Sequence, residues 1–215
     1  MERWATFDCY GTLIDWDGGV RAELVHVFGD DAADAKLERY HEVEPEIQRD
    51  GTLSYREVLT ESMRQLGAPA GSEHVLAESL PGWRAFPEVQ RSLEELRRRG
   101  WRLAILSNTD TAFIAASQVQ IGVPFDEIVV AQEIGSYKPA HRHWEEFFHR
   151  TRAPREGHVH VAASLFHDIA PANELGLRSI WINRLDETPP ANAQPTRELT
   201  DLFELPEVLD ELVPG

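Results

Sequence analysis

The spacing of the hydrophobic positions changes after the first few residues. The segment Trp4–Phe7 is short, apolar and β-branched, which predicts a buried strand that ends at Asp8. From about residue 17 to residue 88, apolar residues recur every three or four positions, which predicts helices, and no strand pattern stands out. We therefore expect an all-helical unit over residues 17–87, inserted directly after the first strand.

After residue 87, short apolar runs alternate with helical patterns. Such an alternation is typical of a doubly wound parallel sheet. We predict an α/β, Rossmann-like core made of residues 1–16 and 88–215, with residues 17–87 as a small helical insertion. The proline-rich segment 185–198 predicts a surface loop, and 205–212 a short final helix. The predicted strands of this part are 102–106, 127–130, 158–162 and 178–182, and the predicted helices are 88–99, 110–119, 140–151 and 168–175.

Composition and charge narrow the classes of function. The 215 residues include 37 acidic and 21 basic side chains, a formal net charge of −16, and 42% are hydrophobic, which excludes disorder of the whole chain. The acidic balance argues against binding to nucleic acid or to an anionic membrane surface, since both attract basic patches. A single cysteine, no apolar run long enough to span a membrane and no visible secretory signal predict a cytoplasmic protein.

Residues with useful chemistry follow the predicted strands one after another. In an open parallel sheet, ligands bind beyond the carboxyl ends of the strands. We therefore expect two carboxylates, one ammonium and a hydroxyl–amide pair to meet at one edge of the sheet. In chain order these residues are Asp8, the pair Ser107 and Asn108, Lys138, and Asp168.

The same residues stand in four short motifs that together resemble those of the haloacid dehalogenase superfamily. The motifs are FDCYGTLIDW (7–16), LSNTD (106–110), YKP (137–139) and AASLFHD (162–168). The resemblance implies that Asp8 is a nucleophile that forms an aspartyl ester, which water then hydrolyses. Lys138 would hold Asp8 ionised and lower its pKa, and Asp168 would position Lys138 or the water. Ser107 and Asn108 would donate hydrogen bonds to the substrate.

Two positions favour the 2-haloacid dehalogenase branch of that superfamily. Its phosphatases carry a second Asp two residues after the nucleophile, which protonates the leaving oxygen, and Tyr10 occupies that position. They also place a magnesium-binding carboxylate at the position of Ala163, and alanine cannot bind a hard cation. A halide leaves without a proton. The resemblance therefore implies hydrolysis of a small (S)-2-haloalkanoic acid without metal or cofactor.

Other positions depart from that branch or are left open by it. The branch has Ser and Asn in motif four where Ala163 and Leu165 stand, and we consider Ser164 as a replacement. Tyr10 and Thr12, in the turn after Asp8, complete the expected substrate-binding set.

The resemblance also implies that residues 17–87 are a small helical cap over the active site, and that the protein is a homodimer. In that branch an arginine of the cap binds the substrate carboxylate and receives the halide. Arg39 is the first candidate for this arginine, with Arg49 and Arg56 as alternatives.

Two further functions remain open from the sequence. One is a magnesium-dependent phosphatase with an unusual active site, and the other is a catalytically silent fold kept for ligand binding. The histidine pairs 141/143 and 158/160 lack the spacing of a metal site, so we expect solvated side chains beside the strands. For Cys9, next to the nucleophile, we expect inert packing.

Overall fold

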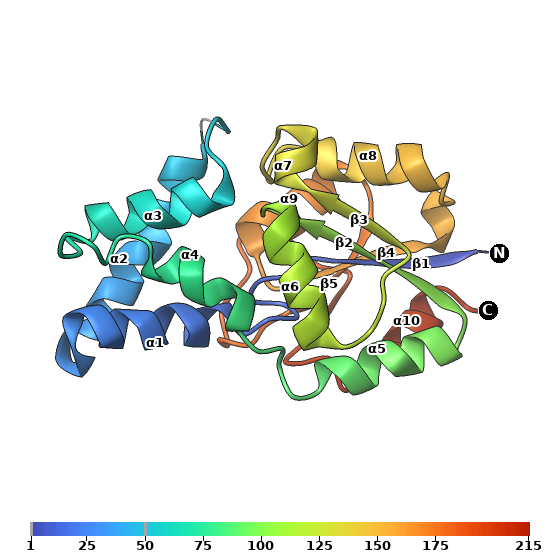
Figure 1. The fold of residues 1–215 in the computed structure, drawn as a ribbon. Coiled ribbons are helices and arrows are strands. Elements are labelled where there is room, and N and C mark those ends of the chain that lie inside the picture. The colour runs from blue at the N-terminus through green and yellow to red at the C-terminus, as the bar shows by residue number, and fades with distance from the viewer. Residues whose placement is uncertain (1, 50) are drawn as a thin grey trace.

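The computed structural model describes residues 2–49 and 51–215. Its centre is a parallel sheet with the strand order β3-β2-β1-β4-β5-β6 (Figure 1). The order reverses between β1 and β4, so the carboxyl ends of these two strands flank the point where such sheets bind ligands. The strands are β1 (Arg3–Phe7), β2 (Trp101–Ser107), β3 (Glu127–Val130), β4 (His158–Ala162), β5 (Arg178–Ile182) and β6 (Arg197–Leu199).

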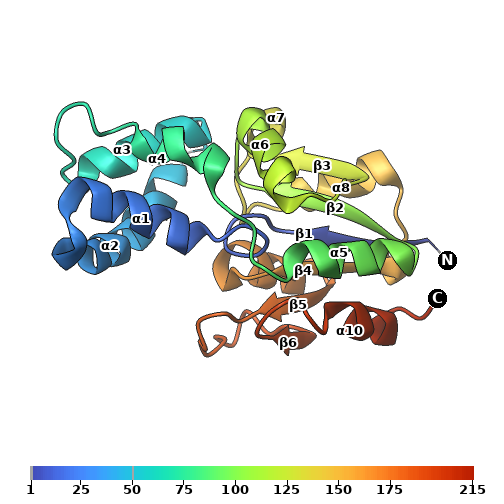
Figure 2. The same cartoon turned by 60° about the horizontal axis from the view of Figure 1, so that its bottom comes forward.

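Helices cover both faces of the sheet, which confirms the predicted α/β, Rossmann-like fold (Figures 1 and 2). Alternate side chains of each strand point to opposite faces, and both faces of β1, β2 and β4 are buried, as expected for a parallel sheet between two helical layers. Phe7 and Val161 pack on the side of α5 (Val89–Arg98), α6 (Thr111–Ile121) and α10 (Leu205–Leu212). Trp4 and Leu106 pack on the side of α8 (Arg142–Thr151) and α9 (Ala170–Glu174).

The chain leaves the sheet after β1 to form a group of helices that lies to one side of the core (Figure 2). These are α1 (Trp16–Phe28), α2 (Asp30–Gln48), α3 (Tyr55–Gln65), α4 (Val75–Ser79) and a 3-10 turn, Leu80–Gly82. The outgoing and returning segments are paired, because Asp15 N–H donates to the Arg84 carbonyl and Phe86 N–H to the Leu13 carbonyl. We call residues 17–87 the cap, and this boundary remains a proposal.

Several local predictions need correction. The segment expected to be only a loop ends in the strand β6, which carries two charged residues and forms the sheet edge, where a charged strand is tolerated. A short helix, α7 (Ala131–Ile134), was not predicted. The helix expected from Asp168 begins earlier, as a π-helical turn over Leu165–Ile169 that runs into α9, and a further 3-10 turn spans Arg155–Gly157.

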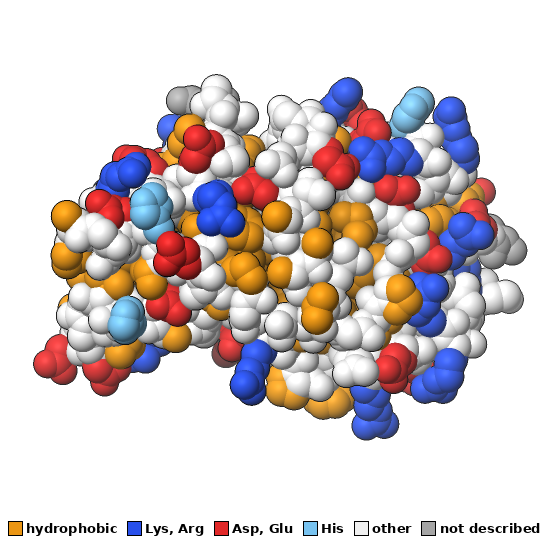
Figure 3. All heavy atoms as spheres, viewed as in Figure 1, with side chains coloured by type: hydrophobic (Ala, Val, Ile, Leu, Met, Phe, Trp, Pro, Cys, Tyr) orange, Lys and Arg blue, Asp and Glu red, His pale blue; other side chains and the backbone are white. Residues whose placement is uncertain are grey.

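On the face drawn in Figure 3, acidic and basic side chains are interspersed instead of forming a basic patch. Among residues 2–49 and 51–215, no helix is long and apolar enough to cross a membrane.

Candidate active site

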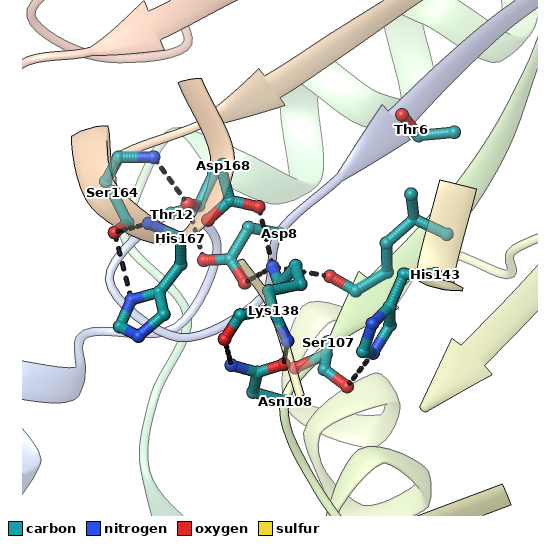
Figure 4. A network of polar contacts seen from close by, with 12 residues as sticks. Thr6, Asp8, Thr12, Ser107, Asn108, Lys138, His143, Ser164, His167 and Asp168 are labelled. Carbon is teal, nitrogen blue, oxygen red and sulfur yellow. Dashed lines mark hydrogen bonds and ion pairs between the residues drawn. The ribbon is translucent and has the colours of Figure 1, made fainter. Parts of the chain in front are cut away.

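The Lys138 ammonium lies between two buried carboxylates, beyond the carboxyl ends of β1 and β4 (Figure 4). Its Nζ donates to Asp8 Oδ1 at 2.8 Å, to Asp168 Oδ1 at 2.6 Å and to the Leu106 carbonyl at 2.9 Å. An ammonium has three N–H donors, so all three are used and the position of Nζ is fixed. The structure thus brings together the three residues that we predict to be catalytic.

Burial and pairing compete in setting the charges of these three groups. Burial raises the pKa of Asp8 and the nearby charge of Asp168 raises it further, while Lys138 opposes both. Burial also acts to raise the pKa of Asp168, but Lys138 and a hydrogen bond from His160 outweigh it, and the pKa is lowered. Burial acts to lower the pKa of Lys138, and the two carboxylates reverse the shift. Lys138 thus lowers the pKa of Asp8 as expected, but burial has the larger effect, and the pKa lies above its ordinary value.

Thr12 connects the first motif to the fourth. Its hydroxyl donates to Asp8 Oδ2 at 3.0 Å and accepts from the Ala163 backbone N–H at 2.9 Å. The tight turn that returns Thr12 to Asp8 contains Gly11 at φ +86°, a backbone region that favours glycine. Each oxygen of Asp8 therefore accepts one side-chain hydrogen bond, which fixes the plane of the carboxylate. Thr12 thus has an orienting contact with Asp8, and its role toward a substrate remains a prediction.

Asn108 holds the backbone of Lys138 and also contacts the cap. Its Oδ1 accepts from the Lys138 backbone N–H at 2.6 Å, and its Nδ2 donates to the Lys138 carbonyl at 3.0 Å and to Gln48 Oε1 at 3.2 Å. The neighbouring Ser107 hydroxyl is buried and has no hydrogen-bond partner among the described residues. A buried hydroxyl next to the Lys138 network is a group that a ligand can satisfy.

The hydroxyls of Tyr10 and Ser164, expected to bind substrate, contact other residues of the protein. The Tyr10 hydroxyl lies 3.0 Å from Ser117 Oγ on α6, and its ring stacks on Tyr55 with centroids 6.0 Å apart. Burial raises the pKa of the Tyr10 phenol. Ser164 Oγ accepts from the His167 backbone N–H at 3.0 Å and caps the π-helical turn. The structure therefore gives Ser164 a local role at the start of this turn, where its carbonyl also accepts from the Asp168 backbone N–H at 3.3 Å. No hydrogen bond joins its hydroxyl to the Asp168 carboxylate among the described residues.

The structure does not bring Arg39 to the site. Its side chain is exposed and pairs with Glu42 on the same helix at 2.6 Å. Arg49 and Arg56 are also exposed, and the Arg56 guanidinium lies over the Phe113 ring at 4.7 Å. The buried side of α2 toward its carboxyl end instead carries Tyr40, Val43, Glu44 and Gln48.

Known proteins are similar to this chain in sequence and in fold. A family model described as haloacid dehalogenase-like hydrolase matches residues 3–176. The chain belongs to the haloacid dehalogenase-like hydrolase family. It is 26% identical to (S)-2-haloacid dehalogenase 4A of Burkholderia cepacia over 94% of this chain and 93% of that protein. The crystal structure of an L-2-haloacid dehalogenase covers 97% of this chain and 99% of its own, with a TM-score of 0.88 and 23% identity.

Phosphatases of the family also match. The glyceraldehyde 3-phosphate phosphatase of Methanothermobacter thermautotrophicus strain Delta H is 32% identical over 46% of this chain and 45% of that protein. Several other curated relatives likewise match over about half of their own length. Membership of the haloacid dehalogenase-like hydrolases is thus established, whereas the substrate has to be argued from the site.

Two histidines behind the site escaped the sequence prediction. His158 and His160 are fully buried in β4, and His143 in α8 is fully buried as well, with its Nε2 3.1 Å from the Ser107 carbonyl oxygen. The expectation of solvated side chains is therefore wrong for these three histidines. His160 Nε2 lies 3.0 Å from Asp168 Oδ1, and Thr6 Oγ1 on β1 lies 2.8 Å from His160 Nδ1 and 2.9 Å from His158 Nε2. The alternation of side chains along β4 was a usable signal, because it places both histidines on the buried face toward α8.

Glu44 and Gln48 of the cap also escaped the prediction. Gln48 Nε2 donates to Glu44 Oε1, while Gln48 Oε1 accepts from Asn108 as described above. Burial raises the pKa of Glu44 to about 7, although hydrogen bonds from Tyr55 and Gln48 and the charge of His41 lower it. The spacing of Tyr40, Glu44 and Gln48, each four residues from the next, could have revealed this helix face.

The residues at the site do not fit the magnesium centre of the phosphatase members. Ala163 supplies no ligand, and Lys138 Nζ already takes Asp8 Oδ1 and Asp168 Oδ1 as partners. Mg²⁺ prefers near-octahedral coordination by several oxygen ligands. Within the described residues, no three His, Cys, Asp or Glu side chains form a group able to hold a metal ion.

Proposed function

We propose that this hydrolase displaces halide from a small (S)-2-haloalkanoic acid, with Asp8 as the attacking group. One observation carries the proposal: Asp8 has an ammonium at 2.8 Å and no second carboxylate two residues further on. The Asp8 oxygen attacks the carbon that bears the halogen, the carbon–halogen bond breaks, and the halide leaves with the bonding electrons. This step produces an ester between Asp8 and the 2-hydroxyacid skeleton, and it involves no proton transfer.

The choice of a carbon–halogen bond rests on the leaving group. An alkoxide leaves poorly unless an acid protonates it, and a phosphatase member supplies an Asp for this purpose. Here the residue in that position is Tyr10, whose hydroxyl is engaged with Ser117 and whose pKa is raised by burial. A halide needs no such acid. The site therefore suits a leaving group that departs as an anion.

Asp168 is suited to the second half of the reaction. Its Oδ1 accepts from Lys138 and His160, whereas its buried Oδ2 has no partner among the described residues. We propose that water attacks Cγ of the Asp8 ester and gives a proton to Asp168 Oδ2. The bond from Cγ to the ester oxygen then breaks, and the departing alkoxide takes that proton from Asp168. The second water proton is released as Asp8 returns to its ionised form, now carrying the water oxygen.

Ser107 and Lys138 offer a place for the substrate carboxylate on the core side. The Ser107 hydroxyl is buried and has no partner in the described part of the chain. A carboxylate that accepts this hydroxyl satisfies a group whose burial otherwise costs about 1–3 kcal/mol. The positive charge of Lys138 nearby favours an anion, and this arrangement makes no use of a cap arginine.

The test is halide release from (S)-2-chloropropionate in EDTA, measured with an ion-selective electrode. We expect turnover by the wild-type chain and none by Asp8→Asn, while Asp30→Asn, at an exposed carboxylate, serves as the matched control. In a single turnover in ¹⁸O-water with enzyme in excess, the label should enter the peptide that contains Asp8, and the first product should be unlabelled. Label found directly in the first product would rule out the ester.

A phosphatase is the second candidate, because phosphatases of the family match this chain at similar identity. It predicts magnesium-dependent hydrolysis across a panel of aryl phosphates. We rank the phosphatase activity below halide displacement because it requires a metal ion, and the site lacks a third carboxylate to bind one. A chain that neither releases halide nor hydrolyses any phosphoester would fit the third alternative, a fold kept for ligand binding.

A further inference from the structure

A chain of hydrogen bonds runs from Asp168 into the core, away from the site. Asp168 Oδ1 lies 3.0 Å from His160 Nε2, His160 Nδ1 lies 2.8 Å from Thr6 Oγ1, and Thr6 Oγ1 lies 2.9 Å from His158 Nε2. Thr6 and His160 face each other in the register of β1 and β4, so the sheet itself sets this contact. All four side chains are at most 1% exposed, and water does not compete for their hydrogen bonds.

One direction of donation suits this chain best. Asp168 is ionised, because Lys138 and His160 lower its pKa, so its Oδ1 is an acceptor and His160 Nε2 carries a proton. In a ring with this single proton, Nδ1 is bare and accepts from the Thr6 hydroxyl. The Thr6 oxygen in turn accepts from His158 Nε2–H, and His158 is neutral because burial lowers its pKa strongly.

The far end of the chain agrees with this direction. His158 Nδ1 is buried and has no hydrogen-bond partner among the described residues. In the direction just derived, that nitrogen is a bare acceptor. In the reverse direction it would be a buried N–H donor with nothing to bind, and orphaned buried N–H groups are rarer than under-used acceptors.

We infer that His160 is a positioning residue: through the Thr6 hydroxyl it is locked as an Nε2–H donor, and it holds Asp168 so that Oδ2 remains free for the water that hydrolyses the ester. This inference rests on the proposed function. It also explains how the site manages without the Ser and Asn that Ala163 and Leu165 replace, because the support of Asp168 comes from behind the carboxylate instead of from its own loop.

The packing around His160 suits a fixed ring. The Trp144 ring meets it edge to face at 5.2 Å, and the Phe147 and Phe148 rings pack against His158 at 5.4 and 5.0 Å. A ring enclosed in this way cannot easily turn over to exchange its two nitrogens. The packing therefore keeps Nε2 toward Asp168, and the Thr6 hydroxyl, by donating to Nδ1, keeps the ring proton on Nε2.

The first test needs no substrate. Nitrogen-15 NMR of the histidine rings should show His160 as the neutral tautomer protonated at Nε2 in the wild-type chain and in Thr6→Ser. In Thr6→Val, which removes the hydroxyl at nearly constant volume, Asp168 still accepts from Nε2–H, so we expect that proton to stay and the Nδ1 resonance to move to the position of a nitrogen without a hydrogen bond. A wild-type ring protonated only at Nδ1, or an Nδ1 resonance that Thr6→Val leaves unchanged, would overturn the inference even if no halide is ever released.

The second test separates positioning from packing. In Thr6→Val and His160→Leu we expect kcat for halide release to fall roughly 10- to 100-fold, as when a reacting group is slightly misplaced. KM should fall together with kcat, so that kcat/KM changes little, and the Asp8 ester should accumulate to a level visible by mass spectrometry, because its hydrolysis is the slowed step. Thr6→Ser should resemble the wild type, and thermal unfolding of each variant controls for folding.

The two proposals fail in different ways. Variants that lose rate without accumulating ester, or a Thr6→Ser variant as slow as Thr6→Val, would contradict the role of His160 while leaving halide release by Asp8 intact. Absence of halide release from the wild-type chain contradicts the proposed function alone, since the tautomer measurement still decides the state of His160.

Discussion

Two buried carboxyl groups, one in the core and one in the cap, differ in how the protein compensates for their burial. Asp8 at the end of β1 lies 2.8 Å from the Lys138 ammonium, whereas Glu44 on α2 has only uncharged or weakly basic neighbours such as Gln48 and His41. Burial raises the pKa of both. In the core, the ammonium stabilises the charged form, which a nucleophile requires. In the cap, the carboxyl group takes up a proton near neutral pH instead.

This difference separates the two sides of the site by function. The core side contains one ammonium and two carboxylates, so its net charge is −1 when all three groups are ionised. Its geometry is fixed because all three N–H donors of Lys138 make hydrogen bonds. The cap side contributes a phenol, a titrating carboxyl group and an amide from α2. The attack on the substrate is thus prepared by the core, and the cap contributes a face whose charge depends on pH.

Removing the ammonium should have the largest effect. Lys138→Met leaves Asp8 and Asp168 buried without a cation, and loss of one partner of a buried ion pair costs about 3–5 kcal/mol. We expect the free energy of unfolding to fall by about that amount in urea titrations, and kcat/KM for halide release to fall on the order of a thousandfold, as when a charge-stabilising donor is lost.

A double variant shows that the two effects of Lys138→Met have different origins. Adding Asp168→Asn removes one of the uncompensated charges and should restore part of the stability but none of the activity. A Lys138→Met variant that is as stable as the wild type would mean that the ammonium does not stabilise the core carboxylates. Core and cap would then not differ in the way they hold a buried carboxyl group such as Glu44.

Glu44→Gln should stabilise the protein at alkaline pH. A carboxyl group with a folded-state pKa of about 7 and an ordinary value of 4.5 binds more protons in the folded state than in the unfolded state between these pH values. The free energy of unfolding therefore decreases as pH rises through this window, by up to about 3 kcal/mol. We expect Glu44→Gln to gain up to that amount at pH 8 and to gain little at pH 4.5. Urea titrations of both chains across this range provide the measurement, and equal slopes against pH would contradict the assignment.

The sequence predicted the core side of the site well because strand ends constrain it. Asp8, Lys138 and Asp168 each follow a strand of a parallel sheet, and the sheet topology brings the carboxyl ends of strands to one edge. His160 could not be placed in the same way. Its contact with Thr6 depends on the register between β1 and β4, which no local pattern in the sequence specifies.

The cap was predicted less well because distance along the chain does not determine the side of a helix. Arg39 was chosen for its spacing from Asp8, but the buried stripe of α2 passes through Tyr40, Glu44 and Gln48, and its neighbour Arg39 is left in solvent. Ser164 failed for a different reason. A serine at the start of a helical turn has backbone N–H partners nearby, and here its hydroxyl contacts the His167 backbone N–H and the His167 ring.

The pH profile of kcat/KM should report the core carboxylate. Asp8 attacks only when ionised, and burial raises its pKa above the ordinary 3.8. The rate should therefore fall about tenfold for each pH unit below that raised pKa, with the acid limb lying above the range of an exposed carboxyl group. Initial rates of halide release between pH 3 and 9 measure it, provided that the chain stays folded. An acid limb at or below pH 3.8 would show that Lys138 dominates after all.

The smallest effect is expected for Arg39→Ala, and this variant tests the cap most directly. The Arg39 side chain is 54% exposed and pairs with Glu42, itself 66% exposed, so its loss should change the free energy of unfolding by no more than about 0.5 kcal/mol. If the substrate carboxylate is held from the core by Ser107 and Lys138, kcat/KM should also stay within a factor of about two, a change worth less than 0.5 kcal/mol. A loss of a hundredfold or more in kcat/KM with unchanged stability would show that α2 turns this arginine toward Asp8 when substrate binds. The cap would then supply a cation of its own.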